Sequence, residues 1–370
     1  MARYPSSVGD GRHRNEGIDV DLHAILQAAA DADASDIHLV AGEPPTVRVH
    51  QVVKHLDFPE ITAENAQSMF ERMAVDEVRA TLDKQKDADF SYQADGLARY
   101  RVNAHRMRKG VGLAMRVIKT KVPPLETLGL PDVIEKLTHL PRGLVLVTGD
   151  TGSGKSTTLA SMINQLNIRE RKHVLTLEDP IEYTFESEKC LIQQRELGAD
   201  MPSFASGLKH ALRQDPDIIL VGEMRDLDTT ALAMSAAETG HLVFSTLHTV
   251  NASQTVSRII DMYPAGQQNQ IRAMLSTTLQ AVISQTLLSR ADRPGMCAAV
   301  ETLLVTPAVR NLIRENRIFE IPNVIETNRA LGMRSLDTAI GELFADGKIT
   351  WDDALATAVY PEKLEKQMAA

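Results

Sequence analysis

The sequence predicts a protein of the α/β class, in which a small α+β domain precedes a larger domain built on a mostly parallel, doubly wound sheet. Residues 18–119 show helix and strand patterns typical of an antiparallel sheet, whereas apolar strands alternate with helices through residues 132–370. A glycine-rich turn, GDTGSGKS at 149–156, separates an apolar strand from a helical pattern. We also expect a disordered lead-in at 1–17 and a proline-containing linker at 120–131.

Composition and charge argue against several classes of protein. The 370 residues include 40 Lys and Arg against 49 Asp and Glu, and this net charge of −9 argues against nucleic acid as the main partner. Cys190 and Cys297 form no C-x-x-C pair, so neither a zinc site nor a disulfide framework is indicated. No apolar run approaches the roughly 20 residues of a membrane span, and the N-terminus lacks the apolar core of a signal peptide. We therefore expect a cytoplasmic protein that does not insert into the membrane.

The first domain begins with a helix whose apolar face runs from Leu22 to Ala29 at helical spacing. Strands are expected at 34–39 and around Val47 and Val49, on either side of the break at Pro44-Pro45. One or two amphipathic helices follow within 62–84. Three further strands are expected around residues 90–92, 100–102 and 113–117. This order of elements is typical of a small α+β domain with an antiparallel sheet.

The second domain alternates strands with helices, the order of a doubly wound sheet. The pattern predicts strands at 144–148, 173–178, 217–222 and 242–246, and helices at 155–166, 203–213 and 228–239. A long helical stretch is expected next, because apolar residues recur from Ile271 and Leu275 through Leu279 and Val282 to Leu287. The C-terminus is expected to be helical, with one apolar face within 336–344 and a cap at Thr350 and Asp353.

The turn at 149–156 fits the phosphate-binding loop pattern G-x-x-x-x-G-K-[S/T] without a mismatch. Glycines in such a loop let backbone N–H groups approach a polyphosphate, and the helix N-terminus adds its own donors. Lys155 would reach the β- and γ-phosphates, and the Ser156 hydroxyl would ligate Mg²⁺. We therefore expect ATP and Mg²⁺ as ligands. The residues expected to contact the nucleotide are Gly149, Asp150, Thr151, Gly152, Ser153, Gly154, Lys155, Ser156 and Thr157.

Polar residues follow three other strands of the second domain, where ligands of open α/β sheets bind. Glu178 ends one strand, as a candidate for Mg²⁺ or water, and Glu223 follows another, where a base polarising the attacking water belongs. Gly222 occupies the place of the aspartate that often ligates Mg²⁺. His241 and His248 bracket a buried strand and could sense the γ-phosphate. The alternatives are a loop cap for Glu178, a structural ion pair of Glu223 with Arg225 or Arg213, and a satisfied core histidine for His241.

The last two strands of the first domain are rich in arginine, at positions 99, 101, 106, 108 and 116. Arg101 and Arg116 lie among apolar residues on adjacent strands, an unusual place for solvated charges. One reading is an arginine finger supplied across a subunit interface, which requires a ring. The other is an ordinary sheet face of long side chains.

Several segments carry a resemblance to a known family. They are ASDIHL (34–39), RYRVNA (99–104), RGLVLVTGDTGSGKSTTLA (142–160), LEDPIEY (177–183), QDPDIILVGEMRD (214–226) and AETGHLVFSTLHT (237–249). Over nearly all of 18–360 the chain resembles the PilT/PilU twitching-motility ATPases of the secretion-ATPase superfamily. The resemblance implies a PAS-like first domain and a RecA-like second domain in a homohexameric ring. It also implies an ATPase that powers type IV pilus retraction from the cytoplasmic face of the inner membrane, with a platform protein and a paralogous ATPase as partners.

The resemblance also implies roles for individual residues. Glu178 matches the acidic-box glutamate, which would hold Mg²⁺ directly or through water, and Glu223 matches the catalytic glutamate. His241 and His248 match the paired histidines of the family. Residues 308–315, AVRNLIRE, resemble a segment that retraction motors require. The inter-subunit arginines of the family match Arg101 and Arg116, and a further phosphate-side arginine matches Arg213.

Two other functions stay open at this point. One is a PilU-like accessory motor that depends on a second retraction ATPase. The other is a regulatory module that binds ATP with little hydrolysis, although the intact Lys155, Ser156, Glu178 and Glu223 argue against it.

Overall fold

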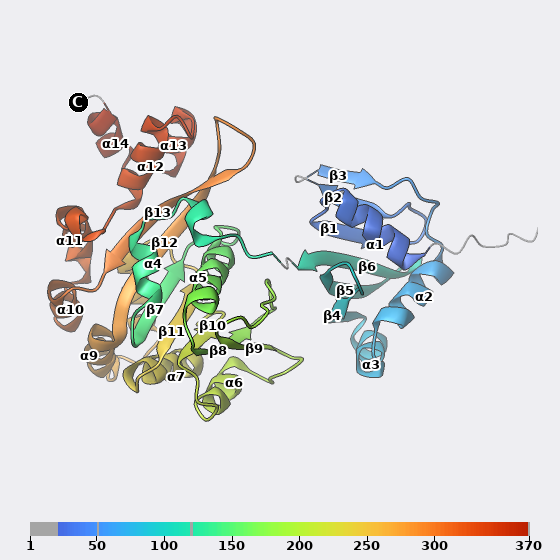
Figure 1. Ribbon diagram of the computed structural model, residues 1–370, viewed down its shortest axis with the longest axis horizontal. Helices are drawn as coiled ribbons and strands as arrows, with labels where there is room; N and C mark the ends of the chain where they lie inside the picture. Colours follow the sequence, from blue (N-terminus) through green and yellow to red (C-terminus); the bar gives the residue numbers. More distant parts are fainter. Residues whose placement is uncertain (1–20, 50–51, 119–120, 369–370) are drawn as a thin grey trace, which may run out of the picture. The chain divides into compact units, whose positions relative to one another are not determined.

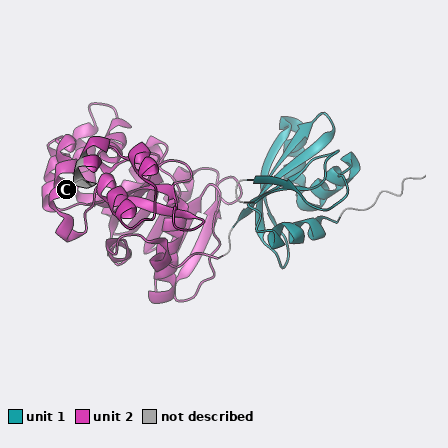
Figure 2. Cartoon of the chain, turned by 90° about the horizontal axis from the view of Figure 1, so that it is seen from above, with its two compact units in different colours: residues 1–118 teal, residues 119–370 magenta. Residues whose placement is uncertain are grey.

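The computed structural model describes residues 21–49, 52–118 and 121–368, so the expected lead-in at 1–17 lies outside the described residues. The chain divides into two compact units, residues 1–118 and 119–370, shown in teal and magenta in Figure 2. Each unit has its own sheet and its own buried core. The predicted α/β class is confirmed.

The described residues of the first unit form a six-stranded antiparallel sheet and three helices, labelled in Figure 1. Its strand order is β3-β2-β1-β6-β5-β4, so the first three strands and the last three meet along β1 and β6. Strand β3 was missed in the sequence, because all four of its residues are exposed at the sheet edge and carry no alternation. The elements are α1 (Leu22–Asp31), β1 (Asp36–Leu39), β2 (Thr46–Val49), β3 (Val52–His55), α2 (Ala63–Met73), α3 (Asp76–Gln85), β4 (Asp87–Gln93), β5 (Arg99–Met107) and β6 (Gly110–Ile118).

The two faces of this sheet differ in polarity because side chains alternate along each strand. One face packs on the apolar sides of the helices, with Ile37, Val102 and Met115 fully buried. The other face carries a cross-strand row of polar residues in register. From β2 to β4 this row consists of Arg48, Asp36, Arg116, Arg101 and Ser91.

The second unit has a seven-stranded sheet in the order β13-β12-β7-β11-β10-β8-β9. All neighbouring strands run parallel except β12 and β13. The strands are β7 (Gly143–Thr148), β8 (His173–Glu178), β9 (Leu191–Glu196), β10 (Ile218–Val221), β11 (Leu242–Leu247), β12 (Leu279–Ser289) and β13 (Met296–Leu304). The longer helices are α5 (Lys155–Arg169), α6 (Phe204–Ala211), α7 (Leu227–Glu238), α8 (Ala252–Asp261), α9 (Gln268–Thr278), α10 (Pro307–Arg314) and α12 (Leu336–Ala345).

Further helical segments belong to the second unit. They are η1 (Leu125–Leu128), α4 (Val133–Thr138), η2 (Ile318–Glu320), α11 (Ile321–Thr327), η3 (Arg329–Leu331), α13 (Trp351–Thr357) and α14 (Pro361–Met368). Ser203 caps α6, and Thr350 caps α13, as predicted for Thr350.

The long helix expected after residue 271 was wrong in its second half. Helix α9 ends at Thr278, and Leu279, Val282 and Leu287 belong to strand β12. This strand is buried on both faces, so its apolar residues form a near-continuous run instead of an alternation. A run of that kind cannot be told from a buried helix by periodicity alone. Strands β9 and β13 were also missed.

Helices cover both faces of the seven-stranded sheet (Figure 1). Along β7, Leu144 and Leu146 face the core formed with α6 to α11, whereas Val145 and Val147 face the core formed with η1, α4 and α5. The end of the β12–β13 hairpin, with Leu288 and Cys297, packs in a further cluster with α12, α13 and α14. Within the described ranges, no helix is both long enough and apolar enough to cross a bilayer.

A buried carboxylate joins two helix starts to β13. Oε1 of Glu301 accepts the N–H of Ala252 at the first residue of α8, at 2.8 Å, and the backbone of Leu336, where α12 begins, also donates to this carboxylate. Burial raises the pKa of Glu301, and these backbone donors oppose the shift. The arrangement satisfies donors that a helix leaves open at its N-terminus.

Candidate active site

The phosphate loop, residues 149–156, joins the buried end of β7 to the start of α5. Gly149, Gly152 and Gly154 adopt positive φ of 138°, 82° and 89°, a region that only glycine enters without strain. A Cβ at position 149 would lie 2.2 Å from the backbone oxygen of Gln285, so this position has no room for a side chain. The N-cap Gly154 gives α5 no side-chain cap, which leaves the first N–H groups of the helix available to an anion.

Lys155 is buried at the first position of α5, with 8 % of its surface exposed. Its Nζ donates to the carbonyl oxygens of Gly149 and Asp150, each at 2.8 Å. Burial lowers the pKa of this ammonium, and the nearby carboxylates of Glu223, Asp150 and Glu182 oppose the shift. The side chain is therefore folded back over its own loop, a position from which it can meet a bound phosphate.

Glu223 follows β10 and lies close enough to Lys155 to interact with it electrostatically. Its Oε2 is 2.8 Å from Nε of Arg225 and 3.3 Å from Nε2 of His248, which follows β11. The strand ends that carry these side chains are tied together, because Thr246 Oγ1 donates to the carbonyl of Gly222 at 2.6 Å. The structure thus brings Glu223, His248 and Lys155 to one edge of the sheet, and it also contains the pairing of Glu223 with Arg225.

Gly222 packs against the end of β8. A Cβ there would lie 3.1 Å from the carbonyl oxygen of Leu177, which is tighter than ordinary van der Waals contact. The aspartate found at this place in other phosphate-loop ATPases would press on that strand.

Glu178 ends β8 and is held by hydrogen bonds from two elements. Its Oε1 accepts from Thr176 Oγ1 at 2.6 Å and from Gln194 Nε2 of β9 at 3.1 Å. Burial raises the pKa of this carboxyl, whereas these donors and the backbone of Glu182 lower it and fail to cancel the shift. With one oxygen already engaged twice, the carboxylate is better placed to bind a metal through water than to enclose one.

Further contacts fix the acidic segment to α5. The hydroxyl of Thr157 lies 2.9 Å from the hydroxyl of Tyr183. Ser156 is partly exposed at the first turn of α5, beside the open helix N-terminus. The oxygen donors of Ser156 and Glu178 suit Mg²⁺, which keeps waters and substrate phosphates among its ligands. In the described part of the chain, no three His, Cys, Asp or Glu side chains gather as a metal site.

Two of the predicted site residues lie at the opposite edge of the same sheet. His241 precedes β11, whose first residue Leu242 pairs with Gly143 at the start of β7. Six strand residues separate it from the loop side, a span of about 20 Å. Its Nδ1 is 3.0 Å from the carbonyl of Ala236. Arg213 is exposed before β10 and lies at the same edge. Neither residue faces the phosphate loop of its own chain.

Arg101 and Arg116 belong to the first unit, where both are exposed on the polar sheet face. Nε of Arg116 lies 2.9 Å from Oδ1 of Asp36, so this side chain already has a partner.

Three residues that hold the site were not predicted from the sequence: Gln194, Tyr183 and Gln285. Gln194 and Gln285 lie on β9 and β12, the strands that were not recognised. Polar residues interrupting an apolar run, as in the segment QAVISQTLL, are the signal that could have marked the second of them.

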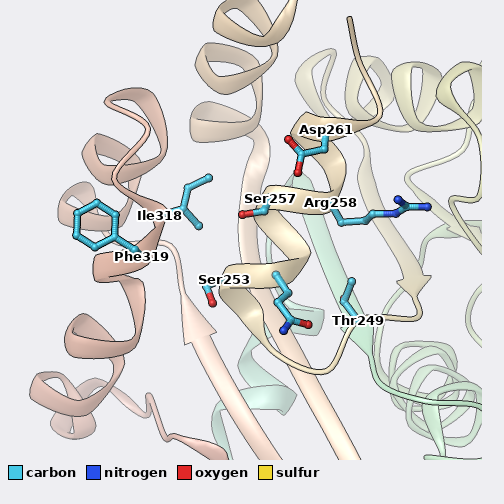
Figure 3. A pocket seen from close by; sticks show the side chains of 8 residues that line it. Thr249, Ser253, Ser257, Arg258, Asp261, Ile318 and Phe319 are labelled. Carbon is cyan, nitrogen blue, oxygen red and sulfur yellow. The ribbon is translucent and has the colours of Figure 1, made fainter. Parts of the chain in front are cut away.

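A separate surface pocket of about 400 Å³ opens between α8 and η2 (Figure 3). Its lining residues include Thr249, one residue after His248, and Phe319, which is 75 % exposed. The predicted AVRNLIRE segment forms most of the neighbouring helix α10.

Comparison with known proteins identifies relatives of the whole chain. The chain is 46 % identical over 343 residues to the type IV pilus retraction ATPase PilT of Pseudomonas aeruginosa, covering 93 % of this chain and 99 % of that protein. It is 37 % identical over 339 residues to the type IV pilus ATPase PilU of the same organism, covering 92 % and 89 %. The crystal structure of the pilus retraction motor PilT with bound ADP matches with a TM-score of 0.89 at 43 % identity, covering 94 % and 99 %.

These matches confirm the resemblance that the motifs indicated. Residues 13–344 also match the family described as type II/IV secretion system protein. By this match and by its identity to full-length relatives, the chain belongs to the type II/IV secretion system protein family.

Proposed function

We propose that the chain is an Mg-ATP-hydrolysing motor that forms a hexameric ring and powers retraction of a type IV pilus. The observation that carries this proposal is the meeting of Glu223, His248 and Lys155 beside the open N-terminus of α5. High identity to a retraction ATPase along nearly its whole length supports the biological role. The ring would work at the cytoplasmic base of the pilus machine, against a platform protein in the inner membrane.

The residues of the site divide the work of hydrolysis. The N–H groups of the loop and of α5 bind the phosphates, and Lys155 turns from its carbonyl partners toward the γ-phosphate. Ser156 and, through water, Glu178 would hold Mg²⁺, which neutralises phosphate charge. Glu223 orients the attacking water and accepts its proton, and His248 fixes one carboxylate oxygen. Arg101 or Arg116 of a neighbouring subunit would stabilise the negative charge that develops on the phosphates in the transition state.

Steady-state ATPase activity across a series of protein concentrations, with mass measured alongside, tests this proposal. Turnover that rises with the hexamer and disappears in Lys155→Ala supports a ring motor with shared sites. Turnover by a monomer contradicts the ring, and tight ATP binding without turnover favours a regulatory module.

The accessory-motor alternative needs a genetic test. Retraction restored in a strain lacking every other retraction ATPase would exclude it, whereas restoration only beside a second motor would support it. Identity is higher to the retraction ATPase than to PilU, 46 % against 37 %, which favours the independent motor.

A further inference from the structure

Gln285 lies directly beneath the phosphate loop, although it comes from a strand more than a hundred residues later. Strand β12 runs parallel to β7, with Ser284 in register with Thr148, the last residue of β7. The next residue along β12 is therefore level with Gly149, where the loop begins. The side chain of Gln285 is buried, with 4 % of its surface exposed.

Both polar atoms of the Gln285 side-chain amide form hydrogen bonds, one with the phosphate loop and one with α5. Nε2 donates to the carbonyl of Ser153 in the loop at 2.6 Å, and Oε1 accepts from Thr158 Oγ1 in the first turn of α5 at 3.0 Å. Its backbone oxygen fills the space that a side chain at Gly149 would need. One residue thus touches the start of the loop, its last turn and the helix that follows.

The contact with Ser153 sets the direction of a phosphate-binding donor. In a planar trans peptide the C=O and the following N–H point in opposite directions. Because Gln285 holds the Ser153 carbonyl beneath the loop, the N–H of Gly154 points away from Gln285, toward the side where an anion meets the loop. Gly154, at a φ of 89°, has no Cβ to restrict its backbone, so without this contact the peptide between Ser153 and Gly154 can turn over.

We propose that Gln285 is a positioning residue of the phosphate loop, which holds the Ser153–Gly154 peptide in the orientation that binds nucleotide phosphate. The inference rests on the proposed nucleotide site. Gln285 raises the fraction of molecules whose loop is in the conformation that binds nucleotide, and it therefore raises the affinity. Glu223 takes part in the chemical step. Once the loop is occupied, the phosphate itself holds the peptide, and turnover at saturating ATP changes little.

The test compares Gln285→Met, Gln285→Glu and the neighbouring Ser284→Ala in the full chain. The methionine variant keeps the volume but neither hydrogen bond, and the glutamate variant keeps an acceptor for Thr158 while removing the donor to Ser153. Ser284 is a matched control, because it too is buried on β12, and its hydroxyl accepts from Thr148, the last residue of β7, at 2.8 Å. Each protein is measured for MgADP affinity by calorimetry, for KM and kcat with ATP, and for Tm.

We expect Gln285→Met to weaken MgADP binding and raise KM by about tenfold, the effect of a loop that is competent in roughly a tenth of the molecules. The kcat should stay within about threefold of the parent. Gln285→Glu should bind more weakly still, since it adds a negative charge beneath the phosphates. Ser284→Ala should lower Tm and leave KM unchanged.

Parental KM and MgADP affinity in both Gln285 variants would overturn the inference, and so would an equal rise of KM in Ser284→Ala. If Gln285→Met does not fold, parental KM and MgADP affinity in Gln285→Glu alone would still overturn the inference. Failure of the nucleotide assignment itself is recognised separately, since the parent would then bind MgADP no better than Lys155→Ala.

Discussion

Arg101 and Arg116 stand directly opposite each other on the antiparallel strands β5 and β6, and Arg116 is paired with a carboxylate. Asp36, on the other side of Arg116, accepts from its Nε at 2.9 Å. Among the residues that the structure describes, Arg101 has no ion pair. Of the two arginines, Arg101 is therefore the one free to meet an anion from another subunit.

The two arginine variants should differ in what they lose. Arg101→Ala should reduce kcat by about 10³-fold, the lower range for an arginine supplied in trans, and leave Tm unchanged. Arg116→Ala also breaks the pair with Asp36, but the Arg116 side chain is 72 % exposed, so that pair contributes at most about 1 kcal/mol to the free energy of unfolding. Arg106→Ala is the control, because Arg106 lies on the same strand and pairs with the exposed Asp83. Equal kcat in Arg101→Ala and Arg106→Ala would exclude Arg101 as a finger.

Replacing Glu223 by Gln should separate binding from chemistry. The amide keeps the shape of the side chain but cannot accept a proton, so kcat should fall by about 10²–10⁴-fold. Binding of MgADP should remain, because the phosphates bind the loop and α5. Single-turnover kinetics with the variant measure the chemical step directly. Hydrolysis at the parental rate would mean that another group is the base.

The Glu178 carboxyl should make the nucleotide-free protein less stable as the pH rises. Its pKa is raised in the folded state, chiefly by burial, so the folded protein holds this proton more tightly than the unfolded chain. Its contribution to stability is therefore greatest at acid pH and is lost as the pH rises from the ordinary value of 4.5 through the raised one. Glu178→Gln removes this dependence, so the Tm of the variant minus that of the parent should grow between pH 5 and pH 8. A difference that is constant with pH would contradict the raised pKa.

Two glycine variants can separate backbone strain from collision within the loop. Gly149→Ala and Gly152→Ala both place a side chain at positive φ, at a cost of about 1–2 kcal/mol. Only Gly149→Ala also meets the backbone of Gln285, whereas nothing lies within 4 Å of a Cβ at position 152. We expect the free energy of unfolding to fall by about 1–3 kcal/mol more in Gly149→Ala. Equal losses in urea titrations would show that β12 yields to the extra methyl group.

Local sequence signals predicted most of the parallel sheet and the loop because those segments carry strong patterns. The run Leu144–Val147 and the glycines after it can be read without any tertiary information. Strand β12 could not be read that way, because Leu279, Val282 and Leu287 fall at spacings that a buried helix shares with a doubly covered strand. Which of the two forms is decided by β7 and β13 on either side.

The same limit decides which site residues can be predicted from the sequence. Glu178, Glu223 and His248 follow recognised strands, so the rule that ligands bind at the carboxyl ends of parallel strands placed them together. His241 and Arg213, predicted as residues of the same site, precede their strands and lie at the other edge. Gln194 and Gln285 act across the sheet from neighbouring strands, a relationship that only strand order reveals.

The hairpin of β12 and β13 connects the phosphate loop to the last three helices of the chain. Its ladder is continuous from Ala281 opposite Leu304 to Ser289 opposite Met296, so sliding either strand along the other would break the whole set of hydrogen bonds at once. The hairpin is therefore rigid. At one point Gln285 contacts the phosphate loop, and at the far end Leu288 and Cys297 pack among α12, α13 and α14. Removing those helices would expose the β12–β13 hairpin to solvent and weaken the support that it gives to the phosphate loop.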